Sequence, residues 1–310
     1  MTDRTEDAMA DHSGEPGANQ RQTADAFGFK WARRDTYESE AIKRNHLAWM
    51  TERYLGGDPA ALDALLAGGR KTILDAGCGA SFSALLLFGQ RLAEHDYIGV
   101  DISDSVAVAE QRFKELGLSG RFIQADLMRV PLPDASADLI FSEGVLHHTD
   151  SVRGAILALT PKLRRGGRML FYVYRKKGPL REFCDDHIRR AIEPLDNEAA
   201  WEALKPLTRL GMALGELNVT VDVPEDVPLL GIPKGPVNLQ RLFYWHVCKA
   251  YYRPDMTLEE MNHVNFDWYR PLNCIRSTPE EIRAYCAEAG LDIERMDVQE
   301  AGITVVARRA

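Results

Sequence analysis

The residues whose types and spacing most clearly indicate a ligand site are an aspartate and two glycines in the segment 71–82. Asp75 ends a short apolar run, and Gly77 and Gly79 follow before an apolar-patterned stretch begins at Phe82. This order predicts a strand, a tight turn and a helix, with backbone N–H groups and a positive helix end facing a ligand above the strand. Glycine also allows a ligand to approach the backbone closely. The sequence therefore predicts a ligand site at this turn.

The spacing of the turn separates it from two glycine-rich nucleotide signatures. A dinucleotide site needs a third glycine at the position that Phe82 occupies, and a phosphate-binding P-loop needs a Gly-Lys-Ser/Thr sequence, which does not follow. Asp75 lies two residues before the first glycine, where it would repel an anionic pyrophosphate. The turn therefore favours a ligand that carries positive charge.

A set of ordered blocks between residues 71 and 174 gives this site a family resemblance. Asp75-Ala76-Gly77-Cys78-Gly79 resembles motif I of the class I S-adenosylmethionine-dependent methyltransferases, with Ser81 where a third glycine is common. The further blocks are Tyr97 to Ser103, Gln124 to Leu127, Ala137 to Ser142, Leu146 to His148, and Arg164 to Gly167 leading into apolar residues 169–174. The resemblance implies an α/β fold with a doubly wound, seven-stranded, mostly parallel Rossmann-like sheet, and S-adenosyl-L-methionine as cofactor.

The same resemblance implies a set of cofactor-binding residues. Asp101 ends the second strand and binds the ribose hydroxyls, which is chemistry shared with other nucleoside sites, while Asp126 and Leu127 flank the adenine amino group. An aromatic stretch around Trp31 resembles the amino-terminal segment with which some small-molecule methyltransferases close over the cofactor; alternatively it only attaches the leader to the core. The predicted set is Asp75, Gly77, Cys78, Gly79, Asp101, Ile102, Asp126, Leu127, Ser142 and Trp31.

Three side chains are predicted to orient the acceptor or remove its proton: His263, His147 and Glu143, in that order. Glu143 and His147 follow the fourth strand, at the crevice where donor and acceptor would meet. The alternative for the tandem histidines is a structural role in the loop. The predicted substrate-binding residues are Tyr174, Tyr244, Trp268 and Tyr269.

The elements that must position these residues alternate along the chain. Helices are predicted over 36–54, 59–66, 82–93, 103–116 and 151–163, with strands over 72–74, 97–100, 122–123, 138–142 and 168–174, which is the order that a doubly wound sheet requires. A helix over 277–289 and a hairpin of strands, 291–298 and 303–307, complete the sheet. The predicted parts are a disordered leader (1–23), a helical lid (24–70), the cofactor-binding core (71–174), a cap (175–276) and the core completion (277–310).

The predicted cap is far longer than an ordinary connection between a strand and a helix. It contains helical segments over 180–192 and 201–214, a proline-broken stretch over 221–236 and an aromatic-rich run over 243–269. An insertion at this edge of the sheet would overhang the cofactor, so we expect it to form an acceptor pocket that is mostly apolar with a few polar groups. Alternatively its aromatic residues form only the cap's own core or a homodimer contact.

The amino-acid composition limits the kinds of molecule that the protein is expected to bind. The chain has 310 residues, of which 45% are hydrophobic and 27% charged, and a net charge of −8, which disfavours a nucleic-acid surface. The short basic clusters Arg164-Arg165 and Arg175-Lys176-Lys177 are interpreted as solvated surface. Five scattered cysteines predict a reducing, cytoplasmic location, no metal site is expected, and no apolar run suggests a signal peptide or a membrane span.

The predicted function is direct SN2 transfer of a methyl group from S-adenosylmethionine to a small organic acceptor, such as a secondary metabolite or a sugar-like or amino-acid-like molecule. An alternative within the same fold breaks the aminocarboxypropyl bond, by transfer or cyclisation, and releases methylthioadenosine. A third is a non-catalytic module that binds S-adenosylmethionine. Asp75 and Phe82 disfavour a nicotinamide oxidoreductase.

Overall fold

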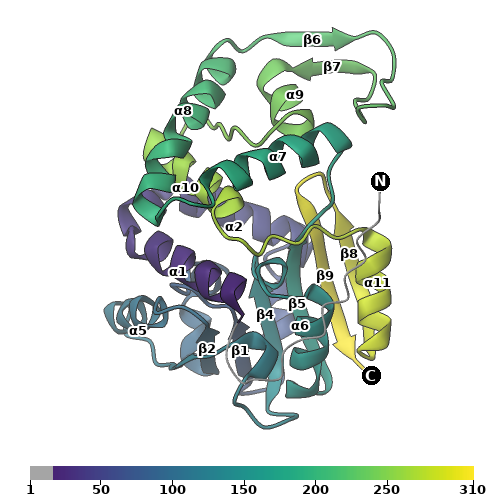
Figure 1. Cartoon of the computed structure of the whole chain (residues 1–310). Helices are drawn as coiled ribbons and strands as arrows, with labels where there is room; N and C mark the ends of the chain where they lie inside the picture. The colour runs from purple at the N-terminus through teal and green to yellow at the C-terminus, as the bar shows by residue number, and fades with distance from the viewer. Residues whose placement is uncertain (1–16) are drawn as a thin grey trace.

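The computed structural model describes residues 17–310 as a layered α/β core with a helical cap above one end of its sheet (Figure 1). The predicted disordered leader falls mainly on residues 1–16, which lie outside the described residues. Residues 18–23 contradict the rest of that prediction, because helix α1 (Ala18–Ala32) already includes them. Gln20 and Thr23 are buried in α1 and bond to Asn273, so contacts with a distant segment hold this part of the helix in place.

The core is a seven-stranded sheet in the order β3-β2-β1-β4-β5-β9-β8, in which β9 runs opposite to the other six strands. The strands are β1 (Thr72–Ala76), β2 (Asp96–Asp101), β3 (Arg121–Gln124), β4 (Ala137–Glu143), β5 (Leu163–Tyr174), β8 (Leu291–Val298) and β9 (Gly302–Arg309). The seven predicted strands and the closing hairpin are confirmed. Strand β5 begins five residues before its predicted start, because Pro161 lies in a short 3-10 turn that ends the preceding helix early.

Apolar residues alternate between the two faces of the sheet, as strand geometry requires. Ile73 and Phe141 belong to the core cluster on one face, and Leu74 and Ile140 belong to the cluster on the other. Helices α2 (Glu40–Leu55), α3 (Ala61–Leu66), α4 (Phe82–Phe88) and α5 (Val106–Glu115) contribute to the first face, and α6 (Val152–Leu159) and α11 (Pro279–Glu288) cover the second. The result is the three-layer arrangement that a doubly wound sheet predicts.

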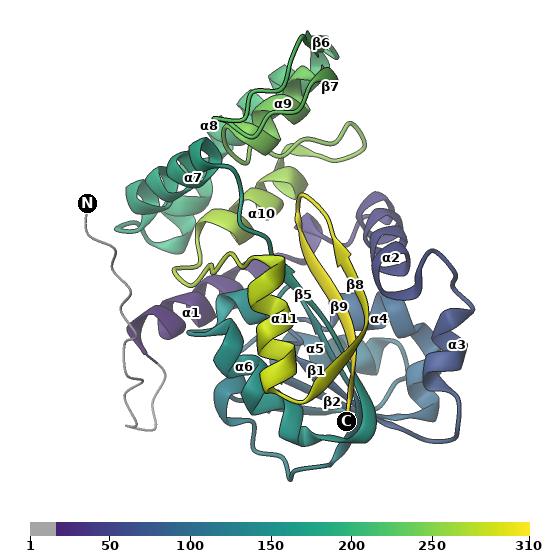
Figure 2. The same ribbon diagram turned by 90° about the vertical axis from the view of Figure 1, so that its right-hand side faces the viewer.

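The cap follows β5 and returns to the core before α11. Its helices are α7 (Pro179–Ile192), α8 (Asn197–Glu216), α9 (Leu239–His246) and α10 (Leu258–Tyr269). The stretch predicted to be proline-broken contains a separate hairpin of β6 (Thr220–Val223) and β7 (Gly235–Asn238). Figures 1 and 2 both place α10 and α1 between the outer cap helices and the sheet.

The helices and the potential metal ligands of the described residues restrict what this part of the chain can do. None of the helices within 17–310 is long and apolar enough to cross a membrane. In the same part of the chain, histidine, cysteine and acidic side chains do not gather in groups of three or more that could hold a metal ion.

Candidate functional site

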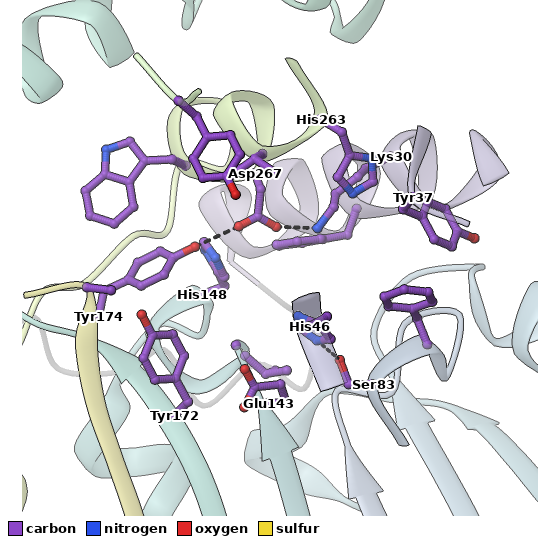
Figure 3. Close-up of a pocket in the computed structure, with 18 of the residues that line it drawn as sticks. Lys30, Tyr37, His46, Ser83, Glu143, His148, Tyr172, Tyr174, His263 and Asp267 are labelled. Carbon is purple, nitrogen blue, oxygen red and sulfur yellow. Dashed lines mark hydrogen bonds and ion pairs between the residues drawn. The ribbon is translucent and has the colours of Figure 1, made fainter. Parts of the chain in front are cut away.

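A cavity of about 580 Å³ lies between the carboxyl ends of the strands, the helices α1 and α2, and the cap (Figure 3). Its lining includes residues from all three regions that the sequence predicted to build the site. Gly77, Asp101, Ile102, Asp126, Leu127 and Trp31 come from the predicted cofactor set, Glu143 and His263 from the catalytic set, and Tyr174, Tyr244 and Trp268 from the substrate set. Asp75, Cys78, Gly79, Ser142, His147 and Tyr269 are not part of this lining.

The turn after β1 is built around glycine. Gly77 has φ of +83°, and a Cβ there would lie 2.1 Å from Val145 Cγ1, so no other residue fits without movement. The backbone N–H groups of Gly77 and Cys78 both donate to the Val100 carbonyl, at 2.7 and 2.9 Å. These two groups therefore tie the turn to β2 instead of facing a ligand, which differs from the expectation drawn from the motif.

Ser81 occupies the position where the resemblance leads us to expect a third glycine. It adopts a left-handed conformation with φ of +54°, which explains why glycine suits this position. Its hydroxyl lies 2.8 Å from the Tyr97 hydroxyl, which in turn donates to Asp75 at 2.5 Å. These buried contacts hold the start of α4 against β1 and β2.

Asp75 lies beneath the turn and not in the cavity. Its carboxyl group is 3% exposed, and burial raises its pKa from 3.8 to about 7, although the Tyr97 hydrogen bond acts in the opposite direction. Its place in the structure is to accept the Tyr97 hydroxyl below the floor of the site. Ser142 is similarly internal, since its hydroxyl donates to the Ala76 carbonyl at 2.8 Å.

Asp101 and Asp126 form the acidic floor of one end of the cavity. Asp101 Oδ2 accepts the Gly79 N–H at 2.8 Å, and Oδ1 accepts the Ser103 N–H and hydroxyl at 2.9 and 2.6 Å. Asp126 accepts the Met128 N–H at 2.9 Å and faces the same space. Because a carboxylate has about four acceptor positions, Asp101 retains capacity for a further donor such as a ribose hydroxyl.

Trp31 covers the glycine turn from above. A Cβ on Gly79 would lie 2.6 Å from Trp31 Nε1, so the indole packs directly on the Gly79 backbone. Tyr37 packs edge-on against the same indole, with ring centroids 5.0 Å apart, and its hydroxyl donates to the Trp31 carbonyl at 2.9 Å. The aromatic segment thus packs on the glycine turn, which is compatible both with a closing lid and with the alternative that it only attaches the leader to the core.

The three predicted catalytic side chains have different surroundings. Both oxygens of Glu143 accept hydrogen bonds from α2, one from Arg53 at 2.7 Å and one from the Tyr54 hydroxyl, although the residue still lines the cavity. His147 is fully buried, packs against Tyr174 with ring centroids 3.6 Å apart, and does not line the cavity. These placements favour the structural alternative for His147.

His263 lines the cavity from α10 and presents one usable nitrogen. Its Nδ1 lies 2.7 Å from Thr36 Oγ1, and that hydroxyl donates its own proton to the Arg33 carbonyl. Nδ1 must therefore donate, which leaves Nε2 as an unprotonated acceptor. Burial and the neighbouring Lys30 charge hold the pKa of His263 well below its ordinary value.

Asp267 joins three elements that are distant in the sequence. Its Oδ1 pairs with Lys30 of α1, and its Oδ2 accepts the Tyr174 hydroxyl of β5 at 2.7 Å (Figure 3). Burial alone would raise its pKa, but the charges of Lys30, His148 and Lys249 hold that pKa well below the usual range. This buried ion pair connects the lid, the sheet and the cap at the centre of the site.

The remaining predicted substrate residues divide between the cavity and the cap's interior. Tyr244 and Trp268 line the cavity. Tyr269 does not, because its hydroxyl donates to Asp185 at 2.6 Å inside the cap, where Trp268 Nε1 also donates to Asp185 at 2.9 Å.

Several lining residues escaped the sequence analysis. His46 of α2 lines the cavity with Nε2 2.9 Å from Ser83 Oγ; it is four residues after Ile42 and three before Trp49, a helical spacing that could have identified it. Lys177 corrects the interpretation of its basic cluster as solvated surface, since it lines the cavity and its amine bonds to the Ala301 carbonyl at 2.7 Å. No sequence pattern identified Lys249 as a cavity-lining residue, because its position depends on how the cap folds.

Comparison with protein families gives one matching domain. A family described as "Methyltransferase domain" matches residues 74–171. An uncharacterized methyltransferase of Mycobacterium tuberculosis is 34% identical over 113 residues, which are 36% of this chain and 54% of that protein. The malonyl-[acyl-carrier protein] O-methyltransferase of Serratia marcescens is 30% identical over 144 residues, 46% of this chain and 51% of that protein. The chain thus spans about half the length of these curated relatives.

Comparison with solved structures supports the fold. The magnesium protoporphyrin IX methyltransferase of Synechocystis with bound SAH superimposes with a TM-score of 0.51 at 15% identity, covering 94% of this chain and all of that one. The same enzyme with bound SAM gives 0.51 at 14% identity and covers 96% of this chain. At this identity the likeness concerns the arrangement of the sheet and its helices.

Proposed function

We propose that the chain is an enzyme of the class I S-adenosylmethionine-dependent superfamily that methylates a small organic acceptor, because residues 74–171 match a methyltransferase domain. One observation carries this proposal. A single cavity joins the predicted cofactor residues at the strand ends, such as Asp101, to cap residues such as Trp268. A cofactor on the floor and an acceptor under the cap would therefore share one continuous space.

The residues present fit S-adenosylmethionine at the floor of this cavity. Gly77 lines the cavity, Asp101 has acceptor capacity for the ribose, and Asp126 with Leu127 borders the position expected for adenine. When bound, the cofactor supplies a methyl group on a sulfonium, whose sulfur retains the bonding electron pair after transfer. The protein's contribution is then chiefly alignment and exclusion of water.

The acceptor must lose one proton when its oxygen or nitrogen is methylated. His263 is the group that we assign to this step, because Nε2 is unprotonated and the ring lines the cavity. Its low pKa makes it neutral at pH 7 and ready to accept a hydrogen bond from the acceptor. Glu143 is less suited, since its buried ion pair with Arg53 stabilises the carboxylate and makes it a weaker base.

The test is to incubate the purified protein with S-adenosylmethionine, with and without a small-molecule extract of its host, and to identify the adenosine product by mass spectrometry. We expect S-adenosylhomocysteine that depends on the extract. Asp101→Asn should abolish it, whereas Asp96→Asn, at the exposed opposite end of β2, should not. Methylthioadenosine above the spontaneous background would contradict methyl transfer and support cleavage of the aminocarboxypropyl bond. Binding without any product would support the non-catalytic alternative.

A further inference from the structure

Four cations lie within 6 Å of the Trp268 ring, Lys177, Arg181, Arg189 and Lys249, and all but Arg189 belong to the wall that the cap contributes to the cavity. The Nζ atoms of Lys177 and Lys249 lie 5.8 and 5.1 Å from the centroid of Trp268, and the Arg181 guanidinium lies 5.4 Å from it. Arg189 is turned away from the cavity toward the Trp268 and Pro271 carbonyls, so only the other three cations line it among the described residues. We call Lys177, Arg181 and Lys249 the cation cluster.

Lys249 is the member of the cluster without a partner. The residue is 6% exposed, and its backbone N–H donates to Asp185 at 3.1 Å. Its ammonium makes no hydrogen bond or ion pair with any other residue in the range 17–310. Burial of an ammonium is costly unless an anion or another acceptor compensates it. The cavity next to Lys249 is the place where such an acceptor can enter.

The acids near the cluster already have partners. Asp185 pairs with Arg181 at 2.5 Å and also accepts Trp268 and Tyr269. Asp267 pairs with Lys30 and accepts the Tyr174 hydroxyl. The charges of Lys177 and Lys249 are therefore not neutralised by a carboxylate in direct contact.

The electrostatics of the two lysines agree with this uncompensated charge. Burial, together with repulsion from Arg181 and Lys249, lowers the pKa of Lys177 to about 7. Burial lowers the pKa of Lys249 to about 8, with Arg181 acting in the same direction and Asp267 in the opposite one. An anion placed between them would reverse both effects.

Aromatic residues continue from the cluster along the same wall. Tyr244 and Trp245 pack edge to face with centroids 4.5 Å apart, and Tyr251 lies 6.1 Å from Tyr244; all three line the cavity. Arg241 adds a further cation 5.6 Å from the Tyr244 ring, and its guanidinium donates only to the Tyr252 carbonyl among the described residues. An apolar or aromatic body fits beside these rings while a charged group reaches the lysines.

We propose that the acceptor is an organic oxyanion, a carboxylate or phosphate on an apolar or aromatic body, whose charged group binds Lys249 and Lys177 beside Trp268. The proposal rests on the proposed function, in that it describes the molecule that the cap holds for methylation. It narrows the substrate class from any small organic molecule to acidic ones, and neutral and cationic acceptors are disfavoured by the cluster.

The test uses small fragments of similar shape, so that differences in binding reflect the charge of the ligand. Benzoate, phenyl phosphate, benzamide and benzylammonium share a ring and differ in charge. Their binding to the full chain is measured by ligand-observed NMR titration at pH 7, with and without saturating S-adenosylhomocysteine. The variants are Lys249→Met, Lys249→Arg and, as a control, Lys114→Met, whose lysine lies on the exposed surface and pairs with Glu110. Melting temperatures verify that each variant is folded.

The expected result is that benzoate and phenyl phosphate bind about tenfold or more tightly than benzamide, because a charge-assisted hydrogen bond replaces a neutral one. Lys249→Met should remove this preference, whereas Lys249→Arg and Lys114→Met should retain it. A preference of more than about tenfold for phenyl phosphate over benzoate would identify a phosphate as the charged group, and the reverse would identify a carboxylate.

Other results would overturn the proposal. They are equal binding of benzamide and benzoate, stronger binding of benzylammonium, absence of binding by either anion, and an anion preference that survives in Lys249→Met. The titrations with S-adenosylhomocysteine distinguish failure of the acidic-acceptor proposal from failure of the proposed methyltransferase function. If S-adenosylhomocysteine binds and the anions show no preference, only the acidic acceptor is refuted. If S-adenosylhomocysteine does not bind, the methyltransferase function is refuted whatever the fragments do.

Discussion

The buried pair of Lys30 and Asp267 allows a quantitative prediction about stability. Asp267→Asn keeps the shape of the side chain and can still accept the Tyr174 hydroxyl, but it removes the charge that Lys30 neutralises. The Lys30 side chain is 7% exposed, so its ammonium would be left buried without a counter-ion. We therefore expect a large loss of stability from a change of one atom.

The magnitude follows from the degree of burial. Breaking a buried ion pair by removing one partner costs about 3–5 kcal/mol, and the 22% exposure of the Asp267 side chain reduces this, so we expect about 2–4 kcal/mol. Lys30→Met combined with Asp267→Asn leaves no unpaired charge. The double variant should therefore recover part of the loss, and the double-mutant cycle gives the coupling energy.

The assay is urea denaturation followed by circular dichroism, with Glu294→Gln as the matched control. Glu294 pairs with Arg168 at 2.7 Å on the surface, and removal of that pair should cost less than about 1 kcal/mol. A loss in Asp267→Asn no larger than in Glu294→Gln would refute the reasoning, because it would mean that the Lys30 charge is solvated in the native protein.

The effect of Asp267 should also depend on pH. Its folded pKa lies well below the unfolded value of 3.8, so its stabilisation is fully present above that value and declines as pH falls below it. The difference between wild type and Asp267→Asn should accordingly be constant from pH 5 to 7 and shrink below about pH 4. A difference that grows on acidification would contradict this assignment.

Three further substitutions test the floor and the acceptor side of the site. Gly77→Ala should lower the unfolding free energy by about 1–3 kcal/mol and weaken S-adenosylhomocysteine binding in calorimetry, because its Cβ would overlap Val145 at a positive φ; unchanged binding would contradict the close fit. Burial raises the folded pKa of Asp75 from 3.8 to about 7, so the stability that it contributes is fully present below pH 3.8 and is lost as pH rises through 7. Asp75→Asn should remove this dependence, and urea midpoints at pH 5 and 8 that vary in parallel with those of wild type would refute it. With the acceptor found in the extract, His263→Gln should reduce turnover about tenfold or more and leave S-adenosylhomocysteine affinity unchanged; full turnover would remove His263 from the mechanism.

The core could be predicted because the residues that specify each of its elements lie close together in the sequence. An apolar run that ends at Asp101 or Asp75 specifies both the strand and the side chain at its carboxyl end, and the parallel order of strands brings those ends to one edge of the sheet. The start of α11 was equally readable, since Thr278 and Glu281 form a capping box around a first-turn proline. The start of β5 was predicted too late because the turn at Pro161 ends the preceding helix early, and the ordered start of α1 was missed because it depends on contacts with the distant Asn273.

On the acceptor side of the site, local sequence patterns do not predict which side chains reach the cavity. The spacing around Trp31 and Trp268 indicated aromatic surfaces in the lid and the cap, but it could not show that Trp31 packs on Gly79. Nor could it show that Trp268 lines the cavity and Tyr269 does not, although both donate to Asp185. Adjacent residues of one helix have different surroundings, and only the packing of that helix against its neighbours determines which side chain reaches the cavity.

The sequence by itself thus determined the seven-stranded core, the glycine turn and the acidic residues at the strand ends, since each depends on residues within a few positions of one another. Only the tertiary structure decided that Lys30 pairs with Asp267, 237 residues away, and that Lys249 is left without a counter-ion beside Trp268. The physical reason is that buried charges are compensated across the interface between lid, sheet and cap, and that interface exists only after the chain has folded.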